Sequence, residues 1–75
     1  MTESAEANTA IGVVEEVLPN SLFRVRVGED GEGELVLAYL AGKMRLHRIR
    51  VLMGDRVDMV LDPYGGRARI VRRLT

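Results

Sequence analysis

The chain has 75 residues, 47% of them hydrophobic, with no cysteine and a formal net charge of zero. This length predicts one small domain, and the absence of cysteine excludes a disulfide framework and thiolate metal sites. No apolar run is long enough to cross a membrane and the first ten residues do not resemble a secretory signal, so a cytoplasmic protein without membrane association is predicted.

A polar tail and a first strand open the chain. Residues 1–9 are small and polar without a hydrophobic period, which predicts a disordered N-terminal tail before a single domain at residues 10–75. Residues 10–18 are rich in β-branched side chains, which favours a strand, and a Pro-Asn-Ser turn ends it. Glu15 and Glu16 are adjacent in this strand, so regular alternation predicts that they point to opposite faces.

The next two strands lie on either side of an acidic, glycine-rich loop. Residues 22–27 alternate, so Phe23 is predicted in the core and two arginines are predicted to make the outer face cationic. Residues 28–33 predict a hairpin loop, and because their spacing does not match a calcium-binding loop, no metal site is predicted. Residues 34–40 predict a third strand, whose inward and outward faces the residue pattern leaves open.

A cationic stretch, GKMRLHRIR at residues 42–50, follows the third strand. The spacing of its apolar residues predicts a single helical turn that runs into an extended segment. Two further strands are predicted at residues 56–61 and 67–73, with Tyr64 in the turn between them packed over a barrel end. This pattern predicts an all-β, five-stranded OB-fold barrel with a short helical turn between strands three and four. An SH3-like barrel, which usually lacks that turn, is the alternative.

The charge is divided unevenly along the chain. Residues 1–40 hold two bases and eight acids, a net charge of −6, whereas residues 41–75 hold nine bases and three acids, a net charge of +6. Most of these bases are arginines, which suit forked recognition of phosphate, so an anionic partner is predicted. The single histidine, the absence of cysteine and the lack of a nucleophile elbow or nucleotide-binding loop predict no enzyme activity and no cofactor.

Cations of the stretch and of the last strand are the candidate nucleic-acid ligands. A closed barrel is expected to bring the loop cations close to a last strand that carries two arginines on one face. These residues are Lys43, Arg45, Arg50, Arg69 and Arg73. Tyr39 and His47 are possible stacking platforms. The chain has only two tyrosines and one phenylalanine, few for a binder of long single strands, which favours recognition of folded RNA through phosphates and shape.

Five motifs occur in the order in which bacterial translation initiation factor one has them, and the chain resembles that family over about residues 10–73. They are LPNSLFRV at 18–25, GKMR at 42–45, IRVLMGDRV at 49–57, DPY at 62–64 and RIV at 69–71. The resemblance implies a monomeric OB-fold protein that binds rRNA of the small ribosomal subunit at the aminoacyl-tRNA site, beside ribosomal proteins. It implies that the protein occludes this site and assists initiation factors two and three.

The resemblance also implies which residues contact rRNA. They are Lys43, Met44, Arg45, Arg50, Arg69 and Arg73. Arg48 is added because it stands where many members have a tyrosine, and arginine can also stack. Arg72 stands where the last strand often has an aromatic residue, and no role is assigned to it. A general single-stranded RNA chaperone of the OB type and a protein-binding SH3-like barrel are the alternative functions.

Overall fold

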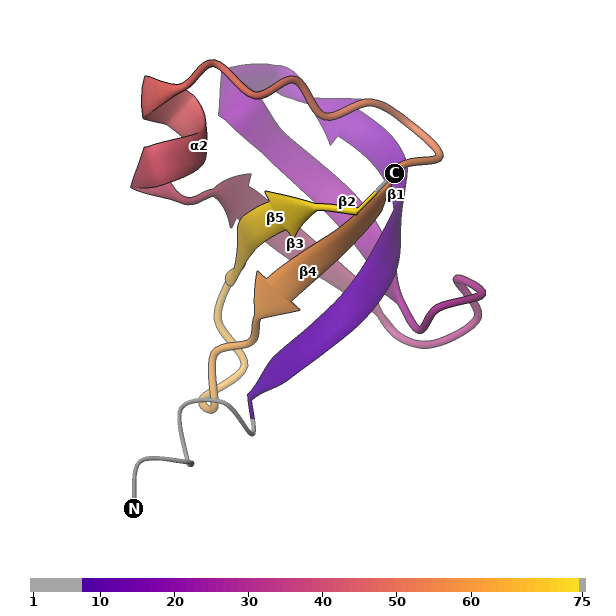
Figure 1. Cartoon of the computed structure of the whole chain (residues 1–75). Helices are drawn as coiled ribbons and strands as arrows, with labels where there is room; N and C mark the ends of the chain where they lie inside the picture. The colour runs from indigo at the N-terminus through magenta and orange to yellow at the C-terminus, as the bar shows by residue number, and fades with distance from the viewer. Residues whose placement is uncertain (1–7, 75) are drawn as a thin grey trace.

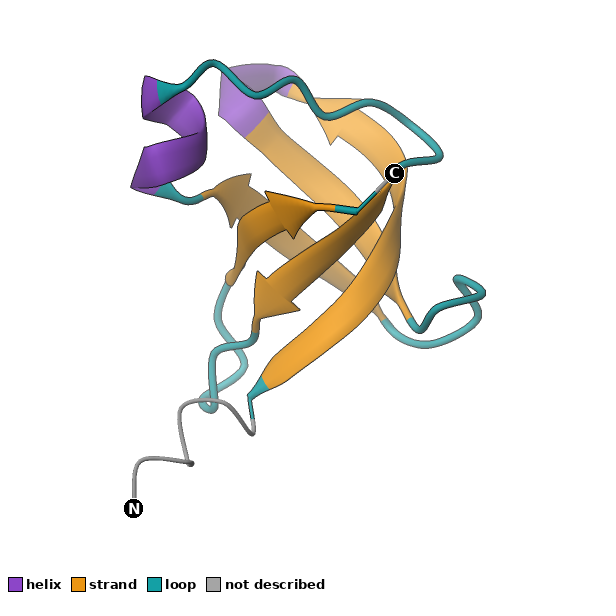
Figure 2. Ribbon diagram, in the orientation of Figure 1, coloured by secondary structure: helices purple, strands orange, loops and turns teal. Residues whose placement is uncertain are grey.

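The computed structural model describes residues 8–74, which form a barrel with one short α-helix (Figure 1, Figure 2). The elements are β1 (Thr9–Leu18), the 3-10 helix η1 (Pro19–Ser21), β2 (Leu22–Val27), β3 (Leu35–Leu40), α2 (Gly42–Leu46), β4 (Arg56–Val60) and β5 (Ala68–Arg73).

The five strands close into a barrel in the order β1-β2-β3-β5-β4. Strands β3 and β5 are parallel, and the other neighbours are antiparallel. This closed barrel with a helix between β3 and β4 is an OB-fold, so the predicted architecture is confirmed and the SH3-like alternative is excluded.

The start of the barrel and the lengths of its helices bear on two of the predictions. Residues 1–7 of the predicted tail lie outside the described residues, and β1 begins at Thr9, one residue before the predicted domain boundary. Among residues 8–74, no helix has the length and apolar character that crossing a bilayer requires.

Strand β1 closes the barrel because it pairs with β2 along one edge and with β4 along the other. Gly12 lies where the two ladders overlap, opposite both Val27 and Val57. A Cβ atom added at Gly12 would lie 2.6 Å from Val25 Cγ1 and 2.8 Å from the carbonyl oxygen of Arg26. Glycine at this position therefore permits the strands to approach so closely that there is no room for a side chain.

Apolar side chains from every strand and from α2 fill the interior. The buried ones are Val14, Phe23, Val25, Ala38, Met44, Val51, Val57, Met59, Ala68 and Ile70. The burial of Phe23 confirms its predicted place in the core. Ala38 is fully buried and Val36 and Leu40 pack against the same cluster, which settles the faces of β3 and turns Tyr39 outward.

A β-bulge at Glu15 places two adjacent acids on the outside of β1. Val14 pairs with Val25 whereas Glu16 pairs with Arg24, so Glu15 is the extra residue. An extra residue in one strand of a ladder interrupts the regular alternation of faces. Both carboxylates reach arginines on the outer face of β2, so the prediction that Glu15 and Glu16 point to opposite faces is wrong.

A second irregularity lies in β5. Ile70 and Arg72 pair with adjacent residues of β4, so Val71 is the extra residue. Arg69 precedes this bulge and Arg73 follows it, and the alternation changes phase between them. The prediction that these two arginines lie on one face of the strand is therefore wrong.

Candidate nucleic-acid interface

Helix α2 ends in a Schellman motif that orders the cationic segment behind it. The Arg48 N–H donates to the carbonyl oxygen of Arg45 at 3.0 Å, and the Ile49 N–H donates to that of Met44 at 2.9 Å. Arg48 has φ of +54°, in the left-handed region where helices commonly place a glycine. The predicted helical turn is confirmed, and residues 49–52 after it form neither a helix nor a strand. The backbone hydrogen bonds hold the start of that segment against the helix end.

Helix α2 packs on the barrel through Met44. This side chain is 4% exposed and belongs to the core cluster, whereas Leu46 on the same helix is 76% exposed. Lys43 and Arg45, on either side of Met44 in the sequence, are both exposed. The direct rRNA contact of Met44 stays a prediction, and in this structure the buried side chain holds the helix on the barrel.

The arginines of the chain differ in whether an acid is paired with them. Ion pairs within residues 8–74 join Arg24 to Glu16, Arg26 to Glu15 and Arg72 to Asp58. The predicted cationic outer face of β2 is therefore neutralised by β1.

A second group of cations makes no side-chain hydrogen bond or ion pair to any described residue. These cations are Lys43, Arg45, Arg48, Arg50, Arg67 and Arg69. Arg73 donates through Nη1 to the carbonyl oxygen of Arg50 at 2.7 Å, so among the described residues it has a neutral acceptor but no acid. These side chains keep donors for an external phosphate, with which guanidinium groups form charge-assisted hydrogen bonds.

Tyr39 borders two surface clefts that arginines line. The parallel pairing of β3 with β5 sets Tyr39 opposite Arg69. A cleft of about 370 Å³ is lined by Tyr39, Arg45 and Arg67 together with two residues near η1. A cleft of about 230 Å³ is lined by Tyr39, Arg67 and Arg69 and by the end of β4 and its following turn. Tyr39, which is half-buried, therefore has three arginines around it, and Asp62 is the acid in the lining of these two clefts. An aromatic ring beside cations is typical of surfaces that bind unpaired bases and their phosphates.

Arg67 is the residue in this group that sequence reasoning missed. It lies in the turn before β5, and its place beside Tyr39 depends on a parallel pairing between strands far apart in the chain. Its basic character was visible in the sequence, but the pairing partner of the last strand was not.

A third cleft, of about 260 Å³, lies between α2 and the end of β5. The lining combines apolar and cationic side chains. The lining residues are Lys43, Met44, His47, Ile49, Val71, Arg72 and Arg73. The structure therefore brings the predicted residues Lys43, His47 and Arg73 together, although the loop and the strand are distant in sequence. His47 is exposed, as a contact with a base or phosphate requires.

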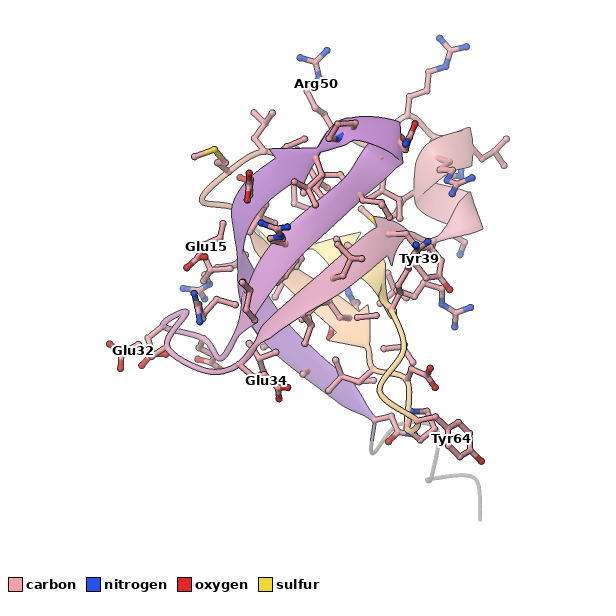
Figure 3. All side chains as sticks on the ribbon, turned by 180° about the vertical axis from the view of Figure 1, so that it is seen from behind. Glu15, Glu32, Glu34, Tyr39, Arg50 and Tyr64 are labelled. Carbon is pink, nitrogen blue, oxygen red and sulfur yellow. The ribbon has the colours of Figure 1, made fainter. Side chains whose placement is uncertain are left out.

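Cations and acids of two connecting segments lie apart. Figure 3 shows Arg50 at the top of the barrel, and Glu32 and Glu34 lower in the view, in the β2–β3 loop. The same figure shows Tyr64 away from the barrel, where it is 93% exposed, so the prediction that it packs over a barrel end is wrong. A charge separation of this kind orients an approaching polyanion toward the cationic end.

Metal-ligating side chains do not gather in residues 8–74 in groups of three or more.

Comparison with known proteins identifies the family. The chain matches the family described as Translation initiation factor 1A / IF-1 over residues 1–75. It is 52% identical over 63 residues to Translation initiation factor IF-1 of Rhodospirillum rubrum, a match that covers 83% of this chain and 63% of the relative. The chain thus spans less than two thirds of that relative's length.

Two solved structures are similar in fold. One is the solution structure of translation initiation factor one from the Wolbachia endosymbiont strain TRS of Brugia malayi, with a TM-score of 0.69 and 31% identity, covering 89% of this chain and 77% of that chain. The other is the crystal structure of YjeQ from Thermotoga maritima, with a TM-score of 0.72 and 30% identity, covering 89% of this chain and 23% of that chain. By the family match and the sequence identity, the chain belongs to the translation initiation factor 1A / IF-1 family, whose members are translation factors and not enzymes.

Proposed function

We propose that the protein is a cytoplasmic translation initiation factor that binds the small ribosomal subunit at the aminoacyl-tRNA site through rRNA contacts. The observation that supports this proposal is the group of cations around α2 and β5 that have no acid partner within residues 8–74, in a chain of this family. The action is steric and not catalytic: the bound protein occludes the site. It favours an initiation-competent subunit to the extent that it binds that state more tightly.

Each part of the interface has a role in this proposal. The phosphate contacts come from the cations around α2 and the start and end of β5: Lys43, Arg45, Arg48, Arg50, Arg67, Arg69 and Arg73. Tyr39 and His47 offer surfaces for unstacked bases. Met44 contributes by anchoring α2, because its side chain is buried. The remaining partners are neighbouring ribosomal proteins and initiation factors two and three on the same subunit, and one monomer fills one site.

The test is binding of the purified protein to vacant small subunits over a range of salt concentrations, with chemical footprinting of the decoding adenines. Arg45→Gln removes an exposed cation that no acid of the described part of the chain neutralises. Arg24→Gln is the matched control, because it removes an exposed arginine that Glu16 already neutralises. We expect one protein to bind per subunit and to alter the reactivity of the adenines. The slope of log affinity against log salt concentration should become shallower by about 0.7–0.9 in Arg45→Gln and stay unchanged in the control.

The same experiment decides between this function and a general single-stranded RNA chaperone. The neutralised outer face of β2 disfavours a chaperone function, because OB-folds bind oligonucleotides on the face of strands two and three. Equal affinity for subunits and for an arbitrary single-stranded oligonucleotide, without a footprint, would support the chaperone. Equal losses in Arg45→Gln and Arg24→Gln would contradict the proposed location of the interface.

A further inference from the structure

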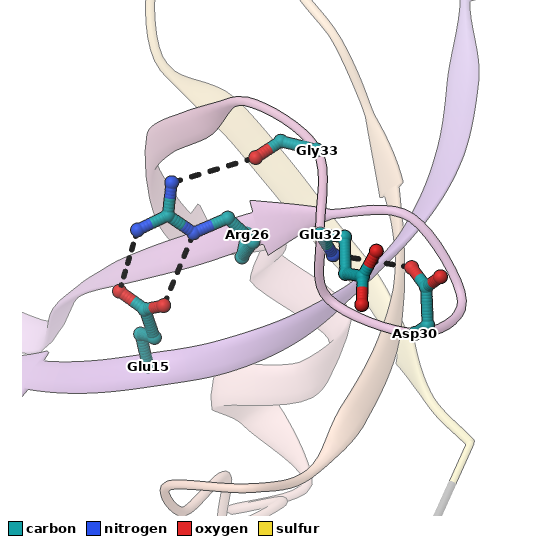
Figure 4. A network of polar contacts seen from close by, with 5 residues as sticks. All are labelled: Glu15, Arg26, Asp30, Glu32 and Gly33. Atoms are coloured by element: carbon teal, nitrogen blue, oxygen red, sulfur yellow. Dashed lines mark hydrogen bonds and ion pairs between the residues drawn. The ribbon is translucent and has the colours of Figure 1, made fainter.

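Two arginines on the outer face of β2 are bound by acids of the same chain. Arg26 donates through Nε and Nη2 to the two carboxylate oxygens of Glu15, each at 3.1 Å (Figure 4). Its Nη1 donates to the carbonyl oxygen of Gly33 at 3.4 Å, so all three nitrogens of the guanidinium have acceptors. Beside this pair, Arg24 Nη1 donates to Glu16 Oε1 at 3.1 Å.

The bulge in β1 is what makes both pairs possible. Glu15 is the extra residue in the ladder and Glu16 is the cross-strand partner of Arg24. With unbroken alternation, one of the two adjacent acids would point toward the core and one arginine would lose its acceptor. Bulges serve in this way to re-aim a side chain.

The position of the pairs coincides with the surface that OB-folds use for oligonucleotides. Arg24 and Arg26 lie on β2 opposite Leu37 and Leu35 of β3, so Arg24 stands at the centre of the β2–β3 ladder and Arg26 at its end beside the loop. A phosphate that approaches Arg26 meets three nitrogens that already have acceptors, and one that approaches Arg24 meets a guanidinium whose Nη1 donates to Glu16. At both arginines the neighbouring carboxylate repels the phosphate. The paired face therefore offers little to a nucleic-acid backbone, while the cations at the other sites remain available.

Stability gives a weak reason for keeping these pairs. The side chains of Arg24 and Glu16 are 50% and 52% exposed, and those of Arg26 and Glu15 are 33% and 48% exposed. Ion pairs at such exposure contribute little to folding because water and salt screen them. Discrimination between partners, in contrast, is often achieved by placing charge against the unwanted one.

We propose that Glu15 and Glu16 determine RNA specificity by masking Arg24 and Arg26. Masking here means that the carboxylates occupy the guanidinium donors and repel phosphate, so that single-stranded RNA does not bind across β2 and β3. RNA contact is then confined to the cations around α2 and β5. This inference rests on the proposed RNA-binding function and adds to it the residues that exclude unstructured RNA.

The experiment compares two double variants that change the net charge equally. Glu15→Gln with Glu16→Gln unmasks the arginines. Glu29→Gln with Glu32→Gln is the control, because these acids are exposed in the β2–β3 loop and their carboxylates pair with no described arginine. The probe is a single-stranded oligouridylate, and its affinity is measured by fluorescence anisotropy between 50 and 200 mM salt.

The unmasked variant is expected to gain two phosphate contacts. Its log–log salt slope should be steeper than the parent's by about 1.4, at about 0.7 per contact on a single strand. Its affinity advantage over the parent should then shrink about sevenfold between 50 and 200 mM salt, and the control should keep the parent's slope. Adding Arg24→Gln and Arg26→Gln to the unmasked variant should return the slope to the parent value.

Three outcomes would overturn the masking. The first is no gain in the unmasked variant, the second is an equal gain in the control, and the third is a gain that survives loss of the two arginines. Thermal unfolding of all variants checks that each is folded. Binding of the parent to vacant small subunits is measured in parallel, and its absence contradicts the proposed function while leaving the oligonucleotide comparison interpretable.

Discussion

Replacement of Arg48 can separate the backbone strain behind α2 from the charge of the side chain. A residue other than glycine in the left-handed region costs about 1–2 kcal/mol, and Arg48 has φ of +54° there. Glycine relieves that cost but enlarges the entropy of the unfolded chain by about 0.4–1 kcal/mol relative to alanine. We therefore expect Arg48→Gly to be more stable than Arg48→Ala by about 0.5–1 kcal/mol.

The comparison is informative because both variants lack the guanidinium. Urea unfolding measures the difference, which corresponds to a Tm about 2–8 °C higher for the glycine variant of a domain this small. Both variants should weaken subunit binding to the same extent and lower the salt slope by about 0.7–0.9, since each loses one exposed cation.

Equal stability of the two variants, or a more stable alanine variant, would refute the argument from left-handed strain. Unequal subunit binding would show that the backbone at this position, and not only the charge, sets the geometry of the interface.

The remaining predictions concern packing. Gly12→Ala should destabilise the fold by about 1–3 kcal/mol, because its Cβ would meet the Arg26 carbonyl. Gly42→Ala, with no atom within 4 Å of the added Cβ, should be neutral or stabilising by up to about 1 kcal/mol, and urea unfolding measures both. Because Met44 is buried and Leu46 is exposed, Met44→Ala should lower the free energy of unfolding by about 2–5 kcal/mol. Met44→Leu should lower it by less than about 1.5 kcal/mol and Leu46→Ala by less than about 0.5 kcal/mol. A stable Met44→Leu variant that loses subunit binding would contradict a purely anchoring role.

Local signals were sufficient to predict the fold. The alternation around Phe23, the turn residues between strands and the single helical turn after the third strand all act over a few neighbours in the chain, and the structure confirms them. The bulges were not predictable in this way. Glu15 and Val71 are extra residues only with respect to a partner strand, so their effect on the alternation depends on a register that the sequence does not display.

The candidate site was predicted in part for the same reason. Lys43, Arg45 and Arg50 are exposed because charged side chains in a connecting segment have no core to enter. Met44 was assigned as a contact by resemblance, and its burial follows from α2 covering the barrel, which local spacing could not distinguish from exposure. Arg67 was missed because only the parallel pairing of β3 with β5 brings it beside the other cations.

The closed strand order has a consequence for the kinetics of folding. Closure needs β1 to reach β4 and β3 to reach β5, and these pairings join segments that are distant in the chain. Such non-local β topologies commonly fold in milliseconds to seconds, because the entropy of loop closure is lost before the contacts form. Met44 of helix α2 belongs to a core that includes Ala68 and Ile70 of β5. The complete packing surface for the helix therefore exists only when β5 has joined the barrel. We therefore expect the cationic segment to become ordered only when the barrel closes, so that an open chain presents no complete surface to RNA.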